Sequence, residues 1–253
     1  MSTYWLDSAR RFFLRKVRDS KVRALNPHYP QSVLVSRATY SPWYADKGFM
    51  RVFDAVRLST LVDIYRCHEL WTLIEQIVDV PGEVLEVGVW KGGTGALISR
   101  RLGDLESNKR VFLCDTFAGV VKSSSKDTLY RGGEHADTSE QEVLGLLAAL
   151  DVSNRAELLK GIFPEQTGGR LEQSSFAFCH IDVDSYLSAK DIFDWVAPRL
   201  SLHGIVVFDD YGFWGCEGVS CLVEELAARR DFIVLRNLNG HAVFIKVKDR
   251  CDA

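Results

Sequence analysis

The sequence has 253 residues, of which 47% are hydrophobic and 26% charged, values typical of a globular protein with a substantial core. Its formal net charge of −3 does not favour nucleic-acid binding, which usually needs a basic surface. No run approaches the roughly 18 apolar residues that span a bilayer, and the N-terminus lacks a signal-peptide pattern, so we expect neither a membrane partner nor secretion.

Six cysteines are scattered through the sequence without a C-x-x-C pair. Two of them, Cys114 and Cys179, lie inside apolar runs typical of strands. This usage is characteristic of reduced thiols in an intracellular compartment. We therefore predict a cytoplasmic protein, and we expect it to form a homo-oligomer.

The first 80 residues predict a helical and irregular extension that belongs to the same domain as the remainder, 81–253. Residues 1–24 read as a basic amphipathic helix that packs on the domain or on a partner subunit, with membrane-surface contact as the alternative. The segment 25–50 is rich in proline and aromatic residues, which predicts either a lid over a substrate or an irregular arm packed on the core. From Val52 to Val78 the helical spacing of apolar residues predicts two helices, or one with a break.

The stretch GEVLEVGVWKGGTGALIS, residues 82–99, predicts a short buried strand, a glycine-bearing turn and the start of an apolar helix. Glycines let a backbone approach a ligand closely, and a helix start points free N–H groups at it. Glu86 lies just before the first glycine, where its carboxylate can meet a cation or hydroxyl groups. The stretch therefore predicts a ligand pocket.

A second apolar strand, VFLCD, ends at Asp115, which follows Gly88 by 27 residues. In a doubly wound fold an acid at this position accepts hydrogen bonds from a ribose diol, and the alternative is that it caps the next turn. The polar segment 120–140 that follows is too long for a simple connection, and long loops are often functional. Its His135 is either a substrate contact or a surface residue.

The rest of the sequence alternates helices and strands, which predicts an α/β fold with a doubly wound, mostly parallel sheet. The expected helices cover 140–150, 188–200 and 218–230, and the expected strands cover 156–160, 176–181 and the run IVVF that precedes Asp209. The last segment predicts a hairpin around Asn239-Gly240 that adds an antiparallel strand.

Acidic residues follow two of the predicted strands: Asp182 and Asp184 come after one, and Asp209 and Asp210 after another. Carboxylates that converge would repel one another unless a cation lies between them. Oxygen ligands of this kind suit Mg²⁺, Ca²⁺ or Mn²⁺ better than Zn²⁺. The alternative is that Asp209 and Asp210 only end a strand and cap a helix.

The dinucleotide fingerprint G-x-G-x-x-G is absent after the first strand, and E-x-G-x-x-x-G fits the adenosylmethionine pocket of methyltransferases better. The segments VLEVGVW and KGGTG, followed by CDTFAG, HIDVDSY and VVFDDYG, resemble the macrocin O-methyltransferase family over roughly Val52 to Lys246. That family methylates sugar hydroxyls of macrolide antibiotics and related compounds. The resemblance therefore implies a class I methyltransferase fold in which S-adenosylmethionine is the methyl donor.

The resemblance also implies roles for individual residues. A Mg²⁺ ion would be bound by Asp182, Asp209 and Asp210. The cofactor would be bound by Glu86, Val87, Gly88, Trp90, Lys91, Gly92, Gly93, Thr94, Asp115, Thr116 and Phe117. Direct transfer of the methyl group needs a base for the acceptor hydroxyl. Ser185 occupies the position of the lysine base in catechol-type enzymes, so Asp182 is our first candidate, with Asp184 and His180 as the others.

The acceptor is not identified by the sequence. A sugar on a secondary metabolite and a sugar of a surface glycan both remain open, and we expect its recognition in the N-terminal region and in residues 120–140. Three rival functions are an NAD-dependent oxidoreductase, a binding module without activity and a related metal-dependent hydroxylase. The missing fingerprint argues against the first and the intact acids against the second. The third is disfavoured because no two-His-one-carboxylate set is evident in the sequence.

Overall fold

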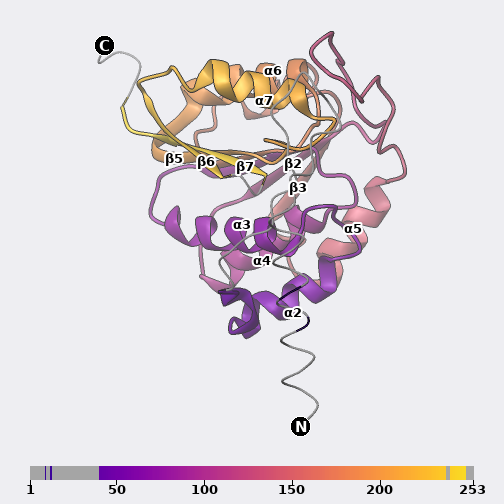
Figure 1. The fold of residues 1–253 in the computed structure, drawn as a ribbon. Coiled ribbons are helices and arrows are strands. Elements are labelled where there is room, and N and C mark those ends of the chain that lie inside the picture. The colour runs from indigo at the N-terminus through magenta and orange to yellow at the C-terminus, as the bar shows by residue number, and fades with distance from the viewer. Residues whose placement is uncertain (1–8, 10–11, 13–39, 238–239, 249–253) are drawn as a thin grey trace. The chain divides into compact units, whose positions relative to one another are not determined.

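The computed structural model describes residues 9, 12, 40–237 and 240–248 (Figure 1). The chain forms two compact units, Met1–Ala45 and Asp46–Ala253. The described part of the first unit contains a short 3-10 helix, η1 (Pro42–Tyr44). The predicted helix over 1–24, apart from residues 9 and 12, and the predicted irregular segment up to residue 39 lie outside the described residues. The division of the chain at residue 80 stays a prediction.

The second unit is built on a seven-stranded sheet with the order β3-β2-β1-β4-β5-β7-β6. The strands are β1 (Glu83–Val87), β2 (Val111–Asp115), β3 (Ala156–Lys160), β4 (Phe176–Ile181), β5 (Leu200–Phe208), β6 (Phe232–Asn237) and β7 (His241–Lys246). The first five strands run parallel, and β7 pairs antiparallel with both β5 and β6. The structure thus confirms a mostly parallel sheet with an antiparallel hairpin at its end.

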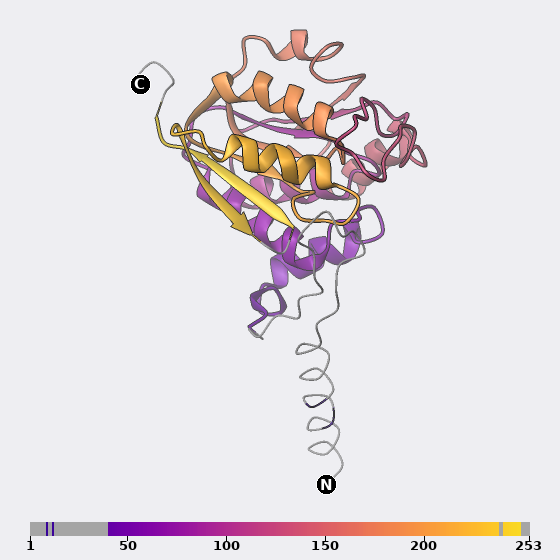
Figure 2. The same cartoon turned by 45° about the horizontal axis from the view of Figure 1, so that its top comes forward.

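Helices cover both faces of this sheet, as Figures 1 and 2 show, with α6 and α7 on one face and α3 and α4 on the other. The helices of the unit are α2 (Lys47–Val56), α3 (Ile64–Gln76), α4 (Gly93–Asp104), α5 (Glu140–Ala149), α6 (Tyr186–Val196), α7 (Glu217–Leu226) and the 3-10 helices η2 (Gly168–Leu171) and η3 (Ala197–Arg199). Because both faces are covered, the central strand β4 is buried along its whole length. In the part of the chain that the structure describes, no helix is long and apolar enough to cross a membrane.

Side-chain caps explain where the first two helices begin. The Asp46 side chain accepts a hydrogen bond from the N–H of Phe49 at 2.9 Å, so α2 starts at Lys47, inside the stretch that the sequence predicts to be irregular. Asp63 accepts from the N–H groups of Tyr65 and Arg66 and starts α3. The apolar pattern from Val52 to Val78 therefore holds two helices, as expected, with a break at residues 57–63.

The predicted helix over 188–200 is wrong at both ends. It begins two residues earlier, at Tyr186, and ends at Val196. Pro198 lies in the following 3-10 turn, because proline has no N–H to continue an α-helix. Strand β5 then begins at Leu200, before Gly204, and its pairing with β4 is interrupted between Phe176 and Phe178.

The site is positioned by the reversal of strand order in the middle of the sheet. From β1 the chain proceeds to β2 and β3 on one side, whereas β4 lies on the other side of β1 and leads to β5. The main-chain N–H of Asp182 donates to Val87 O at 2.9 Å, so the carboxyl ends of β1 and β4 are joined directly. Sheets of this kind bind ligands in the crevice beyond such a reversal.

Candidate functional site

A cavity of about 260 Å³ lies at the carboxyl ends of β1, β2, β4 and β5. It brings together most of the residues that the sequence singles out. Its lining includes Val87, Gly88, Trp90, Thr94, Asp115, Thr116, Asp182, Asp184, Asp209 and Asp210. Glu86, Lys91, Gly92, Gly93, Phe117 and His180 lie outside the lining, beside or behind the cavity wall.

The glycines of the turn after β1 are needed first by the packing of the protein itself. Gly88 has a φ of 91°, and a Cβ built on it would lie 1.6 Å from the carbonyl oxygen of Asp182. A Cβ on Gly93 would lie 2.6 Å from Ser59 O, which accepts the Gly93 N–H at 2.9 Å. A close approach to a ligand, the reason inferred from the sequence, is therefore not the only constraint on these positions.

Asp115 holds the shape of this turn. Its Oδ2 accepts the N–H groups of Val89 and Trp90 at 2.7 and 2.8 Å, and its Oδ1 accepts the N–H of Phe117 at 2.7 Å. A carboxylate has about four lone-pair positions, so one remains for a ligand. The contact of Asp115 with a ribose diol stays a prediction. The structure adds a second role, in which Asp115 stabilises the turn after β1.

The polar loop 120–140 is tied to this turn and to α6. Asp137 receives the Trp90 indole N–H at 3.0 Å and the Lys91 ammonium at 2.9 Å. Asp127 is buried and accepts the N–H of Tyr186 at 2.8 Å, at the start of α6. His135 lines the cavity, with Nε2 3.9 Å from a carboxylate oxygen of Asp184. The loop thus closes one side of the cavity, where the sequence predicts substrate contacts.

Asp182, Asp209 and Asp210 converge in the cavity, next to Asp184. Each offers an oxygen, and these oxygens all lie within 4.8 Å of one another. Burial, and then the negative charges of Asp209 and Asp210, raise the pKa of Asp182 well above its usual value. Burial and the charges of Asp184 and Asp209 do the same to the pKa of Asp210. The charge of His180 lowers the pKa of Asp182, and that of Arg66 lowers the pKa of Asp210, but both effects are outweighed. Three converging oxygens fit a hard divalent cation such as Mg²⁺.

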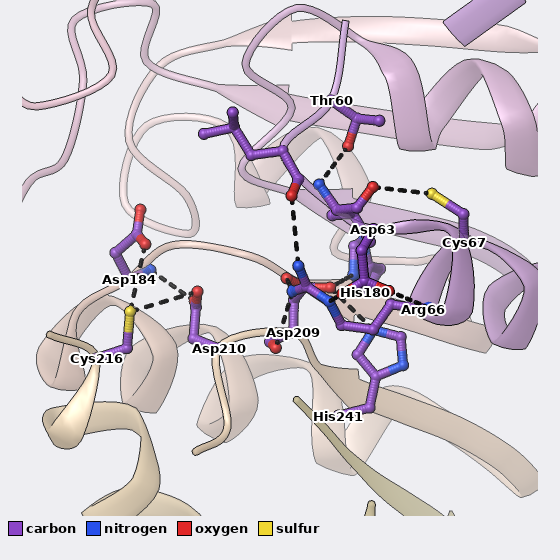
Figure 3. Close-up of polar contacts among 12 residues, drawn as sticks. Thr60, Asp63, Arg66, Cys67, His180, Asp184, Asp209, Asp210, Cys216 and His241 are labelled. Atoms are coloured by element: carbon purple, nitrogen blue, oxygen red, sulfur yellow. Dashed lines mark hydrogen bonds and ion pairs between the residues drawn. The ribbon is translucent and has the colours of Figure 1, made fainter. Parts of the chain in front are cut away.

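Asp209 is in a different situation, because three cationic or potentially cationic groups surround it (Figure 3). Its Oδ2 is paired with the guanidinium of Arg66, and its Oδ1 lies 2.9 Å from His241 Nε2 and 3.4 Å from His180 Nε2. Burial alone would raise the pKa of Asp209, but contacts with His180, His241 and Arg66 outweigh it and hold the pKa well below its usual range. Asp209 is therefore a carboxylate with or without a bound cation.

His180 is fully buried between two acids. Its Nδ1 lies 2.9 Å from Oε1 of Glu86, which is also fully buried. Burial lowers the pKa of His180, but its contacts with Asp209 and Glu86 outweigh this effect and raise the pKa to about 10. The imidazole can hold Asp209 in place, whereas its position behind the wall does not favour the role of a base for a substrate.

Three residues of this network, Arg66, Glu69 and His241, are absent from the predicted site. Glu69 Oε2 lies 2.5 Å from His241 Nδ1 and also accepts from the side chain of Asn237. A signal was present in the spacing Asp63, Arg66, Glu69, which places the aspartate that caps α3 and two charged residues of the helix along one face.

Three of the eight described non-glycine residues with left-handed backbone line the cavity. Trp90, His135 and Asp184 line it with φ values of 47°, 63° and 60°. Residues other than glycine rarely adopt this conformation, and it clusters at functional sites. The Asp184 turn lets its own N–H donate to Asp210 at 2.8 Å, and its Oδ1 lies 3.6 Å from the thiol of Cys216 (Figure 3).

Together, the strand order, the glycine turn after β1 and the aspartates after β4 and β5 define a class I methyltransferase fold. The chain belongs to the macrocin-O-methyltransferase (TylF) family, whose model matches residues 52–244. The family inferred from the sequence motifs is thereby confirmed.

Curated relatives of the chain are named as O-methyltransferases. The chain is 31% identical over 175 residues to the 8-demethyl-8-(2,3-dimethoxy-alpha-L-rhamnosyl)-tetracenomycin-C 4'-O-methyltransferase of Streptomyces olivaceus. It is 27% identical over 183 residues to the demethyldecarbamoylnovobiocin O-methyltransferase of Streptomyces niveus. The matched part is 62% of this chain and 64% of the first relative, and 68% and 69% for the second.

The fold is shared with solved methyltransferase structures. The O-methyltransferase NovP superposes with a TM-score of 0.67 at 23% sequence identity, over 75% of this chain and 83% of that chain. This likeness confirms the predicted class I methyltransferase fold.

Proposed function

We propose that this protein transfers the methyl group of S-adenosylmethionine to a hydroxyl group of a sugar in a glycosylated natural product. The single observation that carries the proposal is the cavity in which the glycine turn meets the aspartates. Asp182 joins the two, because its carbonyl oxygen contacts Gly88 and its carboxyl lies beside Asp209 and Asp210. Family membership and the curated relatives support a sugar hydroxyl as the acceptor.

On this proposal Val87, Gly88, Trp90, Thr94, Asp115 and Thr116 bind the methyl donor directly, and Glu86, Lys91, Gly92, Gly93 and Phe117 hold the binding turns in shape. Asp182, Asp209 and Asp210 would hold Mg²⁺. When bound, S-adenosylmethionine supplies an electrophilic methyl group, and Mg²⁺ supplies a Lewis acid that lowers the pKa of a hydroxyl.

The acceptor oxygen forms a bond to the methyl carbon while the carbon–sulfur bond breaks, and the hydroxyl proton goes to a carboxylate. Asp182 and Asp184 both line the cavity, so both stay candidates for this role, with the enclosed His180 third. Asp184 is not one of the three proposed metal ligands. Burial, as the main cause, raises the pKa of Asp184 and favours a carboxyl that takes up a proton.

The test is calorimetric titration of the full chain with S-adenosylmethionine, S-adenosylhomocysteine and NADH, each with Mg²⁺ and with EDTA. We expect micromolar binding of the first two ligands and none of NADH. Methyl transfer to glycosides should then require Mg²⁺. Binding of NADH alone, or of none of the three, would overturn the proposed function.

A further inference from the structure

The mouth of the cavity carries three exposed apolar side chains, Leu61, Phe213 and Trp214, which we call the rim. Their side chains are 65%, 38% and 53% exposed, and all three line the cavity. They come from two connections, the one between α2 and α3 and the one between β5 and α7. The second connection starts at the aspartates themselves, since Trp214 follows Asp210 by only four residues. Exposed apolar surface beside a cavity usually marks a binding surface.

Trp214 differs from other tryptophans of the protein in having no stacking partner among the described residues. Trp71 packs against a phenylalanine and an arginine, Trp195 does the same, and Trp90 stacks with Lys91. Phe213 beside it is fixed, because the Arg66 guanidinium lies 4.3 Å from its ring centre. A large, flat and open ring next to a fixed one can accept the flat apolar part of a ligand at little cost in side-chain order.

The charge of the cavity restricts what this ligand can be. Five aspartates line it: Asp115, Asp182, Asp184, Asp209 and Asp210. Among the described lining residues one arginine, Arg66, opposes them, and it is already paired with Asp209 and Asp63. One divalent cation leaves an excess of acids, so the cavity attracts a sulfonium cation and repels an anionic acceptor such as a nucleoside diphosphate sugar.

We propose that the rim binds an uncharged, apolar aglycone that carries the methylated sugar, with Trp214 as its main contact. This inference rests on the proposed function and specifies its acceptor as a neutral glycoside. The sugar hydroxyl reaches Asp182 and Asp210 inside the cavity while the aglycone lies outside on Leu61, Phe213 and Trp214. The rim therefore determines specificity and takes no part in the methyl transfer.

The experiment measures binding of two rhamnosides that differ only in the aglycone, 4-nitrophenyl α-L-rhamnopyranoside and methyl α-L-rhamnopyranoside. Deoxythymidine diphosphate glucose is the anionic probe. The proteins are the full wild-type chain, Trp214→Ala, Trp214→Phe and the control Leu144→Ala, a residue on α5 that is 50% exposed and outside the cavity lining. Each is titrated with Mg²⁺ and saturating S-adenosylhomocysteine, and its thermal midpoint and oligomeric state are recorded.

We expect the wild type to bind the nitrophenyl glycoside at least about tenfold more tightly than the methyl glycoside, as burial of an aromatic group predicts. Trp214→Ala should remove this preference without changing affinity for S-adenosylhomocysteine. Trp214→Phe should keep most of the preference, and Leu144→Ala should keep all of it.

Equal affinity for the two glycosides, binding of neither, or an unchanged preference in Trp214→Ala would overturn the rim as an aglycone site. So would tighter binding of the nucleoside diphosphate sugar. A wild-type dimer that Trp214→Ala dissociates would assign the rim to a second copy of the chain. If S-adenosylhomocysteine binds, methyl transfer from S-adenosylmethionine stands under all of these outcomes, although tighter binding of the nucleoside diphosphate sugar would also reject a glycosylated natural product as the acceptor. Loss of S-adenosylhomocysteine binding in the wild type would reject the function itself.

Discussion

Asp115 and Asp210 lie on two sides of one cavity and are held in opposite ways. Asp115 accepts three main-chain N–H groups from the turns around it. Asp210 receives one main-chain N–H, from Asp184, and a long contact from the Cys216 thiol. The donors to Asp115 are main-chain groups of the turns, whereas the carboxyl of Asp210 lies beside those of Asp182 and Asp209. A carboxylate that accepts several main-chain hydrogen bonds stabilises the turns that supply them. A carboxylate that accepts few of them has negative charge that a ligand can balance.

The same comparison can be made within two consecutive residues. Asp209 forms ion pairs with Arg66 and His241, and among the described residues Asp210 forms none. Substitution of these neighbours should therefore have opposite effects on stability, although both would belong to one metal site. The predictions below use this contrast, from the largest expected effect to the smallest.

Asp210→Asn should reduce Mg²⁺-dependent methyl transfer by about a thousandfold or more, because it removes a ligand from the cation that would activate the acceptor hydroxyl. Affinity for S-adenosylhomocysteine should stay within about threefold, since Asp210 is on the acceptor side of the cavity. Single-turnover kinetics and calorimetry measure the two effects. Full activity of the variant in EDTA would remove the metal from the mechanism.

Asp209→Ala should destabilise the protein by about 3 to 5 kcal/mol, because it leaves the buried Arg66 and His241 without their shared acid. This loss makes Asp209 a poor position at which to test the metal by activity alone. Urea unfolding measures the effect, and the double variant Asp209→Ala/Arg66→Met should recover part of the stability. Equal stability of wild type and Asp209→Ala would show that this ion pair does not form in solution.

Asp115→Asn should weaken binding of S-adenosylhomocysteine about tenfold, because an amide replaces the carboxylate that holds the turn at Val89 and Trp90. Calorimetry of Asp115→Asn and Asp210→Asn gives the matched comparison. We expect a large loss of affinity for S-adenosylhomocysteine in Asp115→Asn and a small one in Asp210→Asn. If both variants bind the ligand as the wild type does, the turn does not depend on Asp115.

The comparison also shows what the sequence reveals. The strand that ends at Asp115 and the strands that precede Asp182 and Asp209 could be predicted, because apolar runs and turn residues are local signals. The partners of Asp209 could not. Arg66 and His241 are 143 and 32 residues away from it along the chain and come from α3 and β7, and no spacing rule connects such positions.

The glycine turn and the rim are two further cases. The sequence indicates flexibility at Gly88, but only the structure reveals that the neighbour which demands it is Asp182 of the adjacent strand. The sequence around Trp214 contains no pattern that distinguishes an exposed tryptophan from a buried one. The exposure of Trp214 follows from the tertiary fold alone. Local signals thus placed the ends of the strands, while charge balance and exposure depended on long-range packing.

The smallest expected effect is in the pH dependence of stability without metal. The raised pKa of Asp210 means that the folded protein holds a proton that the unfolded chain releases above about pH 4. Its contribution to stability is therefore lost as pH rises from there toward the folded pKa. Asn at this position is neutral at every pH and avoids the loss.

In EDTA, the thermal midpoint of Asp210→Asn should rise relative to that of the wild type as pH increases from 5 to 8. We expect the difference to grow by at least about 2 °C, the shift that about 1 kcal/mol produces in a domain of this size. Mg²⁺ should reduce the difference, because a bound cation stabilises the ionised carboxylate of the wild type and has no such partner in Asn. Leu144→Ala serves as the control, since it removes an exposed side chain without a titratable group. A midpoint difference that stays constant with pH would mean that Asp210 is compensated in the folded protein as Asp209 is, and the contrast between the two neighbours would fail.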